Sequence, residues 1–431
     1  MKFTAAGDLL IQRCLPVDGH YDGFGRVRDF IYQGDFRFAN IEGTVHQYEC
    51  PPSEESGGSW LCITPDILDS IKAFGFNMYA LANNHSLDYS FEGVAKTLEY
   101  TRRAGLKTAG TGMTLSEASE PVYLDCRSGR IALIAATSTF KRYAMAGAQS
   151  AQMMGRPGVN GIRIQETFLV TPEEMDALKR IAEGTAINAY RDIIRKEGYL
   201  PQLAADTFEF GTLMFKMSDK TGRQSSVNEQ DMKRVEKAIF DARLQADAIV
   251  VSLHAHEISG TSKETPDYFI QEFARRSIDA GAHAVVGHGP HLLRPIEIYK
   301  GRPIFYSLGD FILQNENILR GPEQFFTTYG LTSRDTMHDL FATRSAQFTR
   351  GLQTEPKMFE ALIPYWEMNQ GKLTRLLLMP VELGFGQPRS RNGWPRFEPH
   401  KGILQRVAAM SEAFGTRIEI RDGIGEVVLD Q

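Results

Sequence analysis

Short apolar segments rich in β-branched residues recur along the chain, and most are followed by an amphipathic segment. Short apolar runs of this composition are typical of buried strands, whereas apolar residues repeating every three or four positions indicate helices. The expected strands are residues 2–6, 36–41, 77–82, 131–135, 248–253, 284–286 and 303–306. This alternation predicts an α/β fold in which helices cover the faces of a layered sheet.

Two of the expected helices have clear C-terminal ends. Residues 91–104 are followed by Gly105, and residues 267–280 are followed by Gly281. Glycine is favoured just past the last helical residue because it adopts a left-handed backbone conformation without a steric penalty. These glycines therefore set the boundaries of the two helices.

The pattern changes in two parts of the chain. Residues 140–228 contain methionine, glycine and charged residues with helical periodicity, which predicts an inserted helical subdomain above the site. Residues 359–365 and 372–378 are expected to be antiparallel strands joined by a turn. We therefore predict a main domain of residues 1–315 and a β-rich C-terminal extension of residues 316–431 that packs on the same domain.

The composition narrows the classes of partner. The 431 residues are 42% hydrophobic, which is enough for a sizeable core, and the formal net charge is −5. Lys and Arg are dispersed, so neither nucleic acid nor an anionic membrane is an expected partner. The sequence contains no long apolar run and no signal-peptide core, so we expect no membrane segment and a cytoplasmic location. No heptad pattern indicates an oligomeric state.

The four cysteines show no C-x-x-C spacing. Cys50 and Cys62 flank a Ser/Gly-rich loop and could form a disulfide bond if the protein were exported. Free thiols are the expectation for a cytoplasmic protein.

Polar residues gather after the expected strands, where ligands bind in open α/β sheets. They are Asp8, Asn40, Glu42, Asn83, Asn84, His85, Asp88, His254, His256, Glu257, His288 and His291. Any one of them could be a helix cap, a turn residue or a surface residue. Their repetition at five strand ends instead favours a single site.

The residue types at these positions indicate a metal centre. Carboxylates, an amide oxygen and imidazoles form a mixed oxygen and nitrogen ligand set that suits Zn, Mn or Fe, and the absence of a paired thiolate motif argues against a cysteine-based zinc site. We expect one or two divalent ions. An ion of this kind would activate water or polarise an oxygen of the substrate, and an uncoordinated histidine would carry the proton.

These segments together resemble the CapA-like or PgsA-like capsule-polyglutamate biosynthesis family, whose fold is similar to that of the calcineurin-like metallophosphatases. The resemblance rests on residues 7–8, 39–42, 82–89, 108–112, 252–254, 287–291 and 304–311. It implies a layered α/β/β/α sandwich. It also implies metal ligands at Asp8, Glu42, Asn84, His254, His288 and His291. Glu42 stands where the metallophosphatases have a bridging carboxylate, and His85 stands where they have a general acid.

The sequence departs from the metallophosphatase pattern in its first and last motifs. Asp8 is followed by two leucines and not by the Asp-x-His arrangement, so one expected imidazole ligand is missing. His288 and His291 have Gly-His-x-x-His spacing in place of Gly-His-x-His, and Asp310 replaces the usual asparagine of the CapA-like family. The number of ions therefore stays open.

The expected activity is hydrolysis of a phosphoester, amide or poly-glutamyl-type bond, with Asp8, His85 and His288 as catalytic residues. The substrate would be a small molecule or a peptide resembling polyglutamate. Arg294 and His256 are expected to contact the substrate, although Arg294 could instead neutralise Glu297. Two alternatives are a metal-assisted peptide epimerase and a non-catalytic component of polyglutamate capsule synthesis.

Overall fold

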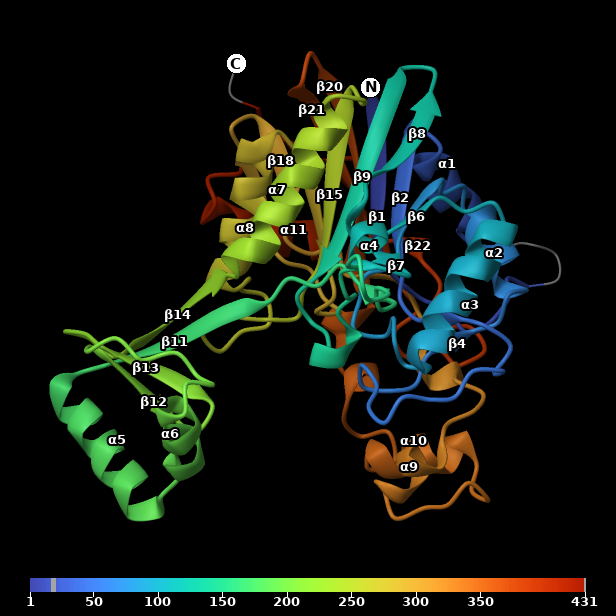
Figure 1. The fold of residues 1–431 in the computed structure, drawn as a ribbon. Coiled ribbons are helices and arrows are strands. Elements are labelled where there is room, and N and C mark those ends of the chain that lie inside the picture. The colour runs from blue at the N-terminus through green and yellow to red at the C-terminus, as the bar shows by residue number, and fades with distance from the viewer. Residues whose placement is uncertain (17–20, 430–431) are drawn as a thin grey trace.

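Two sheets packed face to face form the centre of the molecule, and helices cover their outer faces (Figure 1). The computed structural model describes residues 1–16 and 21–429. The larger sheet contains β1 (Lys2–Leu10), β2 (Phe36–Ile41), β5 (Met78–Ala80), β6 (Thr108–Ala109), β19 (Asp310–Leu313), β20 (Glu360–Asn369), β21 (Lys372–Glu382), β22 (Arg396–Phe397), β23 (Ile418–Arg421) and β24 (Ile424–Val427). The smaller sheet contains β8 (Val122–Cys126), β9 (Gly129–Thr137), β15 (Ala248–His254), β16 (Ala284–His288), β17 (Ile296–Tyr299) and β18 (Arg302–Phe305).

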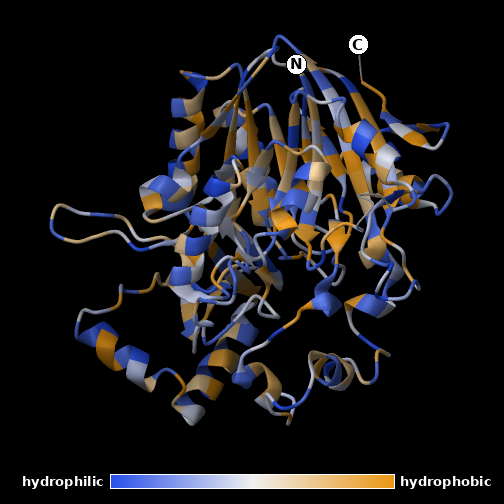
Figure 2. Cartoon of the chain, turned by 90° about the vertical axis from the view of Figure 1, so that its right-hand side faces the viewer, coloured by the Kyte–Doolittle hydropathy of each residue, from blue (hydrophilic) through white to orange (hydrophobic). Residues whose placement is uncertain are grey.

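Alternating side chains of the strands build the layers. In β15, Val250 packs into the core between the two sheets, while Val251 packs into the core beneath the helices. Phe38 of β2 reaches the same intersheet core from the other sheet, and Ala39 faces the opposite way. Successive side chains of a strand point to opposite faces, so a strand buried on both faces is apolar throughout. Figure 2 shows hydrophobic residues concentrated along these central strands.

The helices form the two outer layers. α1 (Phe24–Ile31) and α2 (Ile67–Ala73) pack on the larger sheet, and α7 (Glu229–Arg243) and α8 (Tyr268–Ala280) pack on the smaller sheet. The remaining helices of the main body are α3 (Ser90–Arg103), α4 (Leu115–Ser119) and α11 (Ile403–Glu412). The layers confirm the predicted α/β/β/α sandwich. Two short two-stranded sheets pair β3 (Thr44–Val45) with β4 (Cys62–Ile63) and β7 (Thr111–Gly112) with β10 (Gly158–Val159).

The insertion is a separate lobe of mixed structure, so the prediction of a helical subdomain is wrong in part. Its helices α5 (Pro172–Thr185) and α6 (Ala189–Lys196) lie beside a four-stranded sheet, and the lobe projects from the main body (Figure 1). The strands are β11 (Ile164–Val170), β12 (Thr207–Phe210), β13 (Leu213–Met217) and β14 (Gly222–Val227). Most positions of these strands are half-buried or exposed, and they carry many polar residues, so their apolar periodicity is too weak to distinguish them from loops.

The C-terminal segment continues the larger sheet. β20 and β21 form the expected antiparallel hairpin, and Gln370 and Gly371 at its turn both have positive φ angles. β20 pairs antiparallel with β1, so the last part of the chain extends the sheet that begins at the N-terminus. Residues before β20 form α9 (Glu323–Thr327) and α10 (Met337–Arg344), which lie below the sheets (Figure 1).

Candidate metal centre

Strand register brings the sequence-predicted site residues side by side. Parallel pairing places Asp8 of β1 opposite Asn40 of β2 and opposite Asp310 of β19. In the smaller sheet, parallel pairing of β15 with β16 places His254 opposite His288. Parallel strands end at the same edge of a sheet, and contacts of Asp8 with both histidines join the edges of the two sheets.

Asp8, His254 and His288 form a buried cluster at this joint. His288 Nδ1 lies 3.0 Å from Asp8 Oδ1 and 3.0 Å from His254 Nδ1. Asn40 Nδ2 donates to Asp8 Oδ1 over 2.6 Å, and the backbone N–H of Gly289 donates to Asp8 Oδ2 over 2.8 Å. Burial alone would raise the pKa of Asp8, but the charges and hydrogen bonds of the two imidazoles hold this pKa well below its usual value. Asp8 is therefore an ionised ligand candidate.

His288 has a protein partner at each ring nitrogen. Its Nε2 lies 2.7 Å from Ser252 Oγ, while its Nδ1 faces Asp8. The side chain is 1% exposed, so a substrate has little access to it. This placement suits a metal ligand, with Ser252 fixing the ring, better than the proton carrier that the sequence also allowed.

Glu42 is fully buried, and neither of its carboxylate oxygens has a hydrogen-bond partner in the described part of the chain. His85 Nε2 lies 3.7 Å from Glu42 Oε1, and His254 Nε2 lies 3.9 Å from it. Burial, followed by the charges of Asp8 and Asp310, raises the pKa of Glu42 well above its usual value. Buried carboxylates are normally paired with donors or cations, so Glu42 marks the place where a cation would fit.

Two groups of candidate ligands share Glu42. Within each group, one ligand atom from every residue lies within 4.8 Å of the others. The first group is Asp8, Glu42, His291 and Asp310, and the second is Glu42, His254 and His256. Ligand atoms at about 2.1 Å from one ion are at most about 4.2 Å apart, so a small contraction of either group would close it around a metal. The residues therefore fit one ion, or two ions with Glu42 between them.

Asp310 also belongs to the candidate ligand set, although in the sequence it stands out only as a departure from the family pattern. Its Oδ1 lies 3.0 Å from His291 Nδ1, and its Oδ2 is buried with no hydrogen-bond partner among the described residues. Burial raises the pKa of Asp310 to about 6, against the opposing charge of His291. The overlooked signal was a carboxylate two residues after the mainly apolar block of residues 304–308, where β19 aligns with β1.

His256 was expected to contact the substrate, and the structure places it among the candidate ligands. Its Nε2 lies 3.0 Å from His254 Nε2, and it belongs to the ligand group of Glu42. Burial, followed by the charges of His254 and His291, lowers the pKa of His256 well below its usual value. The ring is therefore neutral, as a metal-binding imidazole must be.

Asn84 has one side-chain atom available for a ligand. Its Nδ2 donates to the carbonyl oxygen of Gly57 over 3.0 Å. Its Oδ1 is buried and has no partner within residues 1–16 and 21–429. The adjacent Asn83 is fully engaged in the loop, since it donates to Ile41 O and accepts the backbone N–H of His85. Of the two asparagines, only Asn84 can offer a free oxygen.

His85 is held by Asp88. His85 Nδ1 lies 2.6 Å from Asp88 Oδ2, which leaves His85 Nε2 directed toward Glu42 at 3.7 Å. Asp88 makes no side-chain cap to α3. A carboxylate at Nδ1 fixes the tautomer and the orientation of the imidazole, so Nε2 is the nitrogen available to exchange a proton.

Arg294 does not face the site, so its assignment as a substrate-binding residue is wrong. It is fully buried, and its guanidinium donates to backbone carbonyl oxygens of Ala255, His256, Glu257 and Lys263. Glu297, the other partner considered, pairs with Arg275 at 3.0 Å. Arg294 therefore fixes the loop that follows β15, and the sequence could not show this because the carbonyl partners are about 30 to 40 residues away.

The other sequence expectations concern thiols and membrane segments. Cys14, Cys50, Cys62 and Cys126 are all free thiols. No helix in the described residues is both long enough and apolar enough to cross a bilayer.

The facing sheets and the carboxylate–histidine cluster at their shared edge define an α/β protein with a candidate metal centre. Residues 2–315 match the model of the family described as bacterial capsule synthesis protein PGA_cap. The chain belongs to this family, which confirms the resemblance seen in the sequence motifs.

Relatives with full-length and partial similarity support this assignment. The chain is 32% identical to the uncharacterized protein y4uA of Sinorhizobium fredii (strain NBRC 101917 / NGR234), over 99% of this chain and 92% of that protein. It is 23% identical to the capsule biosynthesis protein CapA of Bacillus anthracis, over 72% of this chain and 59% of that protein. It is 28% identical to the probable polyglutamine synthesis accessory protein MT0602 of Mycobacterium tuberculosis (strain CDC 1551 / Oshkosh), over 61% of this chain and 51% of that protein.

Proposed function

We propose that this member of the capsule synthesis family is a metal-dependent hydrolase of an amide, phosphoester or glutamyl-type bond. The observation that carries the proposal is the buried carboxylate of Glu42, whose two oxygens lack hydrogen-bond partners among the described residues while two ligand groups include it. When bound there, a divalent ion of Zn, Mn or Fe would lower the pKa of a water molecule or polarise an oxygen of the substrate.

The side chains around Glu42 divide into ligands and one proton carrier. Asp8, Asn84, His254, His288 and His291, together with Asp310 and His256, would hold one or two ions. His85 would exchange the proton through Nε2, because Asp88 occupies its other nitrogen and fixes the ring. Asn40 and the backbone N–H of Gly289 keep the carboxylate of Asp8 in place.

A peptide-like substrate is supported by the relatives. One is named a capsule biosynthesis protein and another a polyglutamine synthesis accessory protein. We infer that the bond hydrolysed is an amide of a poly-amino acid in preference to a phosphoester. Chromogenic glutamyl anilides and phosphodiesters offered in parallel would distinguish the two bond classes.

The test combines metal content with activity. Elemental analysis of protein purified without chelators should find a transition metal, and Glu42→Gln should lose both the metal and hydrolysis of the chromogenic substrates. His85→Asn should retain the metal but lose most of the activity. The exposed His400→Asn is the matched control and should behave as the wild type. Unchanged metal content and activity in Glu42→Gln would contradict the proposal.

Peptide epimerisation is the second candidate, and a specific observation favours it. The site contains two separate His–Asp pairs, His85 with Asp88 and His291 with Asp310. Two such pairs could remove a Cα proton and return one to the other face of the carbon. Solvent deuterium incorporated into an uncleaved glutamyl peptide would identify the epimerase, whereas cleavage identifies the hydrolase.

A non-catalytic role is the third reading, in keeping with a relative named an accessory protein. In that case the purified chain would contain no metal and would bind capsule-synthesis subunits stably. Co-purification with those subunits, combined with elemental analysis, separates this reading from the two enzymatic ones.

A further inference from the structure

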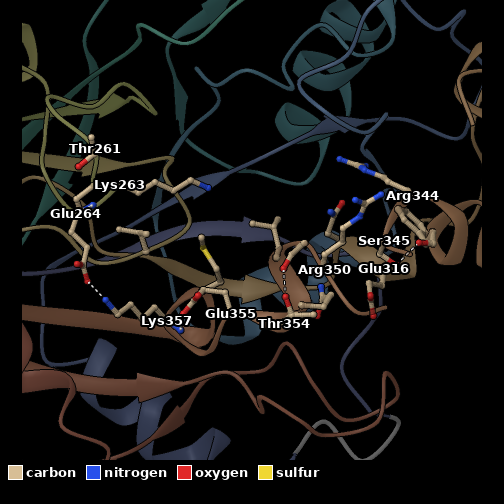
Figure 3. A pocket seen from close by; sticks show the side chains of 18 residues that line it. Thr261, Lys263, Glu264, Glu316, Arg344, Ser345, Arg350, Thr354, Glu355 and Lys357 are labelled. Atoms are coloured by element: carbon tan, nitrogen blue, oxygen red, sulfur yellow. Dashed lines mark hydrogen bonds and ion pairs between the residues drawn. The ribbon is translucent and has the colours of Figure 1, made fainter. Parts of the chain in front are cut away.

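A cavity of about 810 Å³ is lined in part by segments that adjoin candidate ligands in the chain. Its walls come from the loop of residues 261–264, from Leu292, from residues 315–316 after β19, and from residues 341–358 at and beyond the end of α10. Figure 3 shows the side chains that line it. None of these lining residues belongs to the candidate ligand set, so the cavity is a separate chemical environment.

Chain connections tie the cavity to the metal centre. Leu292 lines the cavity and directly follows His291, and Asn315 lines it five residues after Asp310. Arg294 donates to the carbonyl oxygens of Lys263 and His256, which links the cavity wall to the ligand loop. A molecule in the cavity would therefore lie against segments of the chain that also carry candidate ligands.

The cavity contains cations that lack carboxylate partners. Lys357 pairs with Glu264 at 2.9 Å, but the side chains of Lys263 and Arg350 make no ion pair or hydrogen bond to other described residues. Arg344 donates only to Ser59 Oγ at 2.7 Å and pairs with no carboxylate among the residues described. In Figure 3, Lys263 extends from one wall, while Arg344 and Arg350 lie on the opposite wall.

The other two carboxylates that line the cavity do not neutralise these cations, so the net charge of the lining is positive. Glu316 pairs with Arg389 at 3.1 Å, and Glu355 accepts the backbone N–H of Lys357. Glu355 is thus the single lining carboxylate without an ion pair in the described structure. Three lining cations have no ion pair with a carboxylate. Guanidinium and ammonium groups placed around a cavity in this way suit an acidic group of a ligand.

The remaining walls are apolar. Leu292, Phe341 and Met358 are buried side chains that line the cavity, and Leu352 lines it from a half-buried position. An apolar wall next to a cationic one is typical of sites that bind a ligand with both an apolar part and a polar anchor. A ligand consisting of carboxylates alone would leave these apolar side chains in contact with water or with polar atoms.

We infer that the cavity binds an amphiphilic acid, in which an apolar body lies against Leu292 and Phe341 and an acidic group lies between Lys263 and Arg350. The assignment of this acid as part of the substrate rests on the proposed function. It narrows the substrate class to acidic molecules that carry an apolar group beside the reacting bond, as distinct from a polymer of acidic residues alone.

Calorimetric binding to the full-length, metal-free protein tests the cavity without using activity. The probes are 4-phenylbutyrate, its neutral analogue 4-phenylbutanamide, 2-phenylethyl phosphate and glutarate. We expect the amide to bind about tenfold or more weakly than 4-phenylbutyrate because it lacks the charge. Glutarate should bind weakly because it lacks the apolar body. The relative affinity of the phosphate shows which acidic group the cavity prefers.

Variants locate the binding in the cavity. Arg350→Gln and Lys263→Gln should lower the affinity for 4-phenylbutyrate to that of the amide and leave the amide unaffected. Arg180→Gln on α5, which does not line the cavity, is the matched control and should bind as the wild type. All three residues are exposed, so the variants are expected to fold, and unchanged melting temperatures check this.

Three outcomes would overturn the inference. They are equal binding of acid and amide, binding of glutarate as tight as that of 4-phenylbutyrate, and absence of binding by every probe. A protein that binds 4-phenylbutyrate in this way but contains no metal would retain the cavity assignment and lose the proposed hydrolase function, so the two failures are distinguishable.

Discussion

Asp88 Oδ2 lies 2.6 Å from His85 Nδ1. The same carboxylate accepts the backbone N–H groups of Gly57, over 2.9 Å, and Leu61, over 2.8 Å. Burial raises the pKa of Asp88, and the imidazole of His85 and these hydrogen bonds oppose that effect. Asp88 is thus fixed by three donors from two segments of the chain, and the orientation of His85 depends on it.

Asp88→Asn should reduce turnover without removing the metal. The amide provides one acceptor oxygen and carries no negative charge, so the tautomer and the orientation of His85 would be less well defined. Loss of a partner of this kind typically costs about 10- to 100-fold in activity. Measurements of kcat on a chromogenic substrate and of metal content test this prediction. Asp176→Asn on α5 is the exposed control, and an unchanged kcat for Asp88→Asn would show that His85 is not the proton carrier.

Glu42→Leu should have opposite effects on stability with and without metal. In the metal-free protein the variant removes a buried carboxylate without partners, so the free energy of unfolding should rise by about 1–3 kcal/mol. Added Mn²⁺ or Zn²⁺ should raise the melting temperature of the wild type because only the native state binds the ion, but not that of the variant. Thermal denaturation with chelator and with metal measures both effects. A variant that gains as much from metal as the wild type would exclude Glu42 as a ligand.

Arg294→Met should destabilise the protein by about 3 kcal/mol, because it leaves four carbonyl oxygens without their donor. Arg294→Lys should recover little of this loss, since an ammonium cannot reproduce the planar donor geometry of a guanidinium. Urea unfolding monitored by circular dichroism measures the change. Arg180→Lys on the exposed face of α5 is the control. Full stability of Arg294→Met would show that the guanidinium does not fix the loop.

His283 should make folding stability depend on pH between about 6.5 and 4. Burial, with the charges of Arg302 and Arg243, lowers its pKa to about 4, and its Nδ1 accepts the backbone N–H of Ile249. Because the folded pKa lies below the unfolded value of about 6.5, the stabilisation by neutral His283 is complete above pH 6.5. It is lost as the pH falls toward 4. The stability difference between wild type and His283→Asn should therefore shrink over this range in urea titrations. A constant difference would contradict the assignment.

The strands and the helices that cover them could be predicted because each is encoded locally. Residues 248–253 are apolar except for Ser252, which marks a strand buried on both faces, and β15 covers Ala248–His254. Gly281 ends α8 where the sequence indicates. The sheet of the insertion was missed because its strands are exposed and lack a strong apolar pattern.

The candidate site was predictable where a ligand type lies at the C-terminal end of a strand. Asp8 lies near the end of β1, His254 and His288 are the last residues of β15 and β16, and the structure brings the three together. Asp310 was not identified as a ligand, because its approach to His291 depends on the pairing of β19 with β1. His291 itself reaches Asp310 from a left-handed backbone conformation, with φ of 60°, which no local pattern specified.

The sequence by itself determined the α/β alternation, the family and the residue types of the candidate metal centre, because periodicity and motifs are properties of neighbouring positions. The tertiary structure alone decided which of those residues gather around the carboxylate of Glu42, which lacks a hydrogen bond among the described residues. It also decided why Arg294 belongs to the scaffold and which residues line a partly cationic cavity. These properties depend on strand register and burial. Both are set by contacts between segments hundreds of residues apart, such as the hydrogen bond from Gly289 N to Asp8.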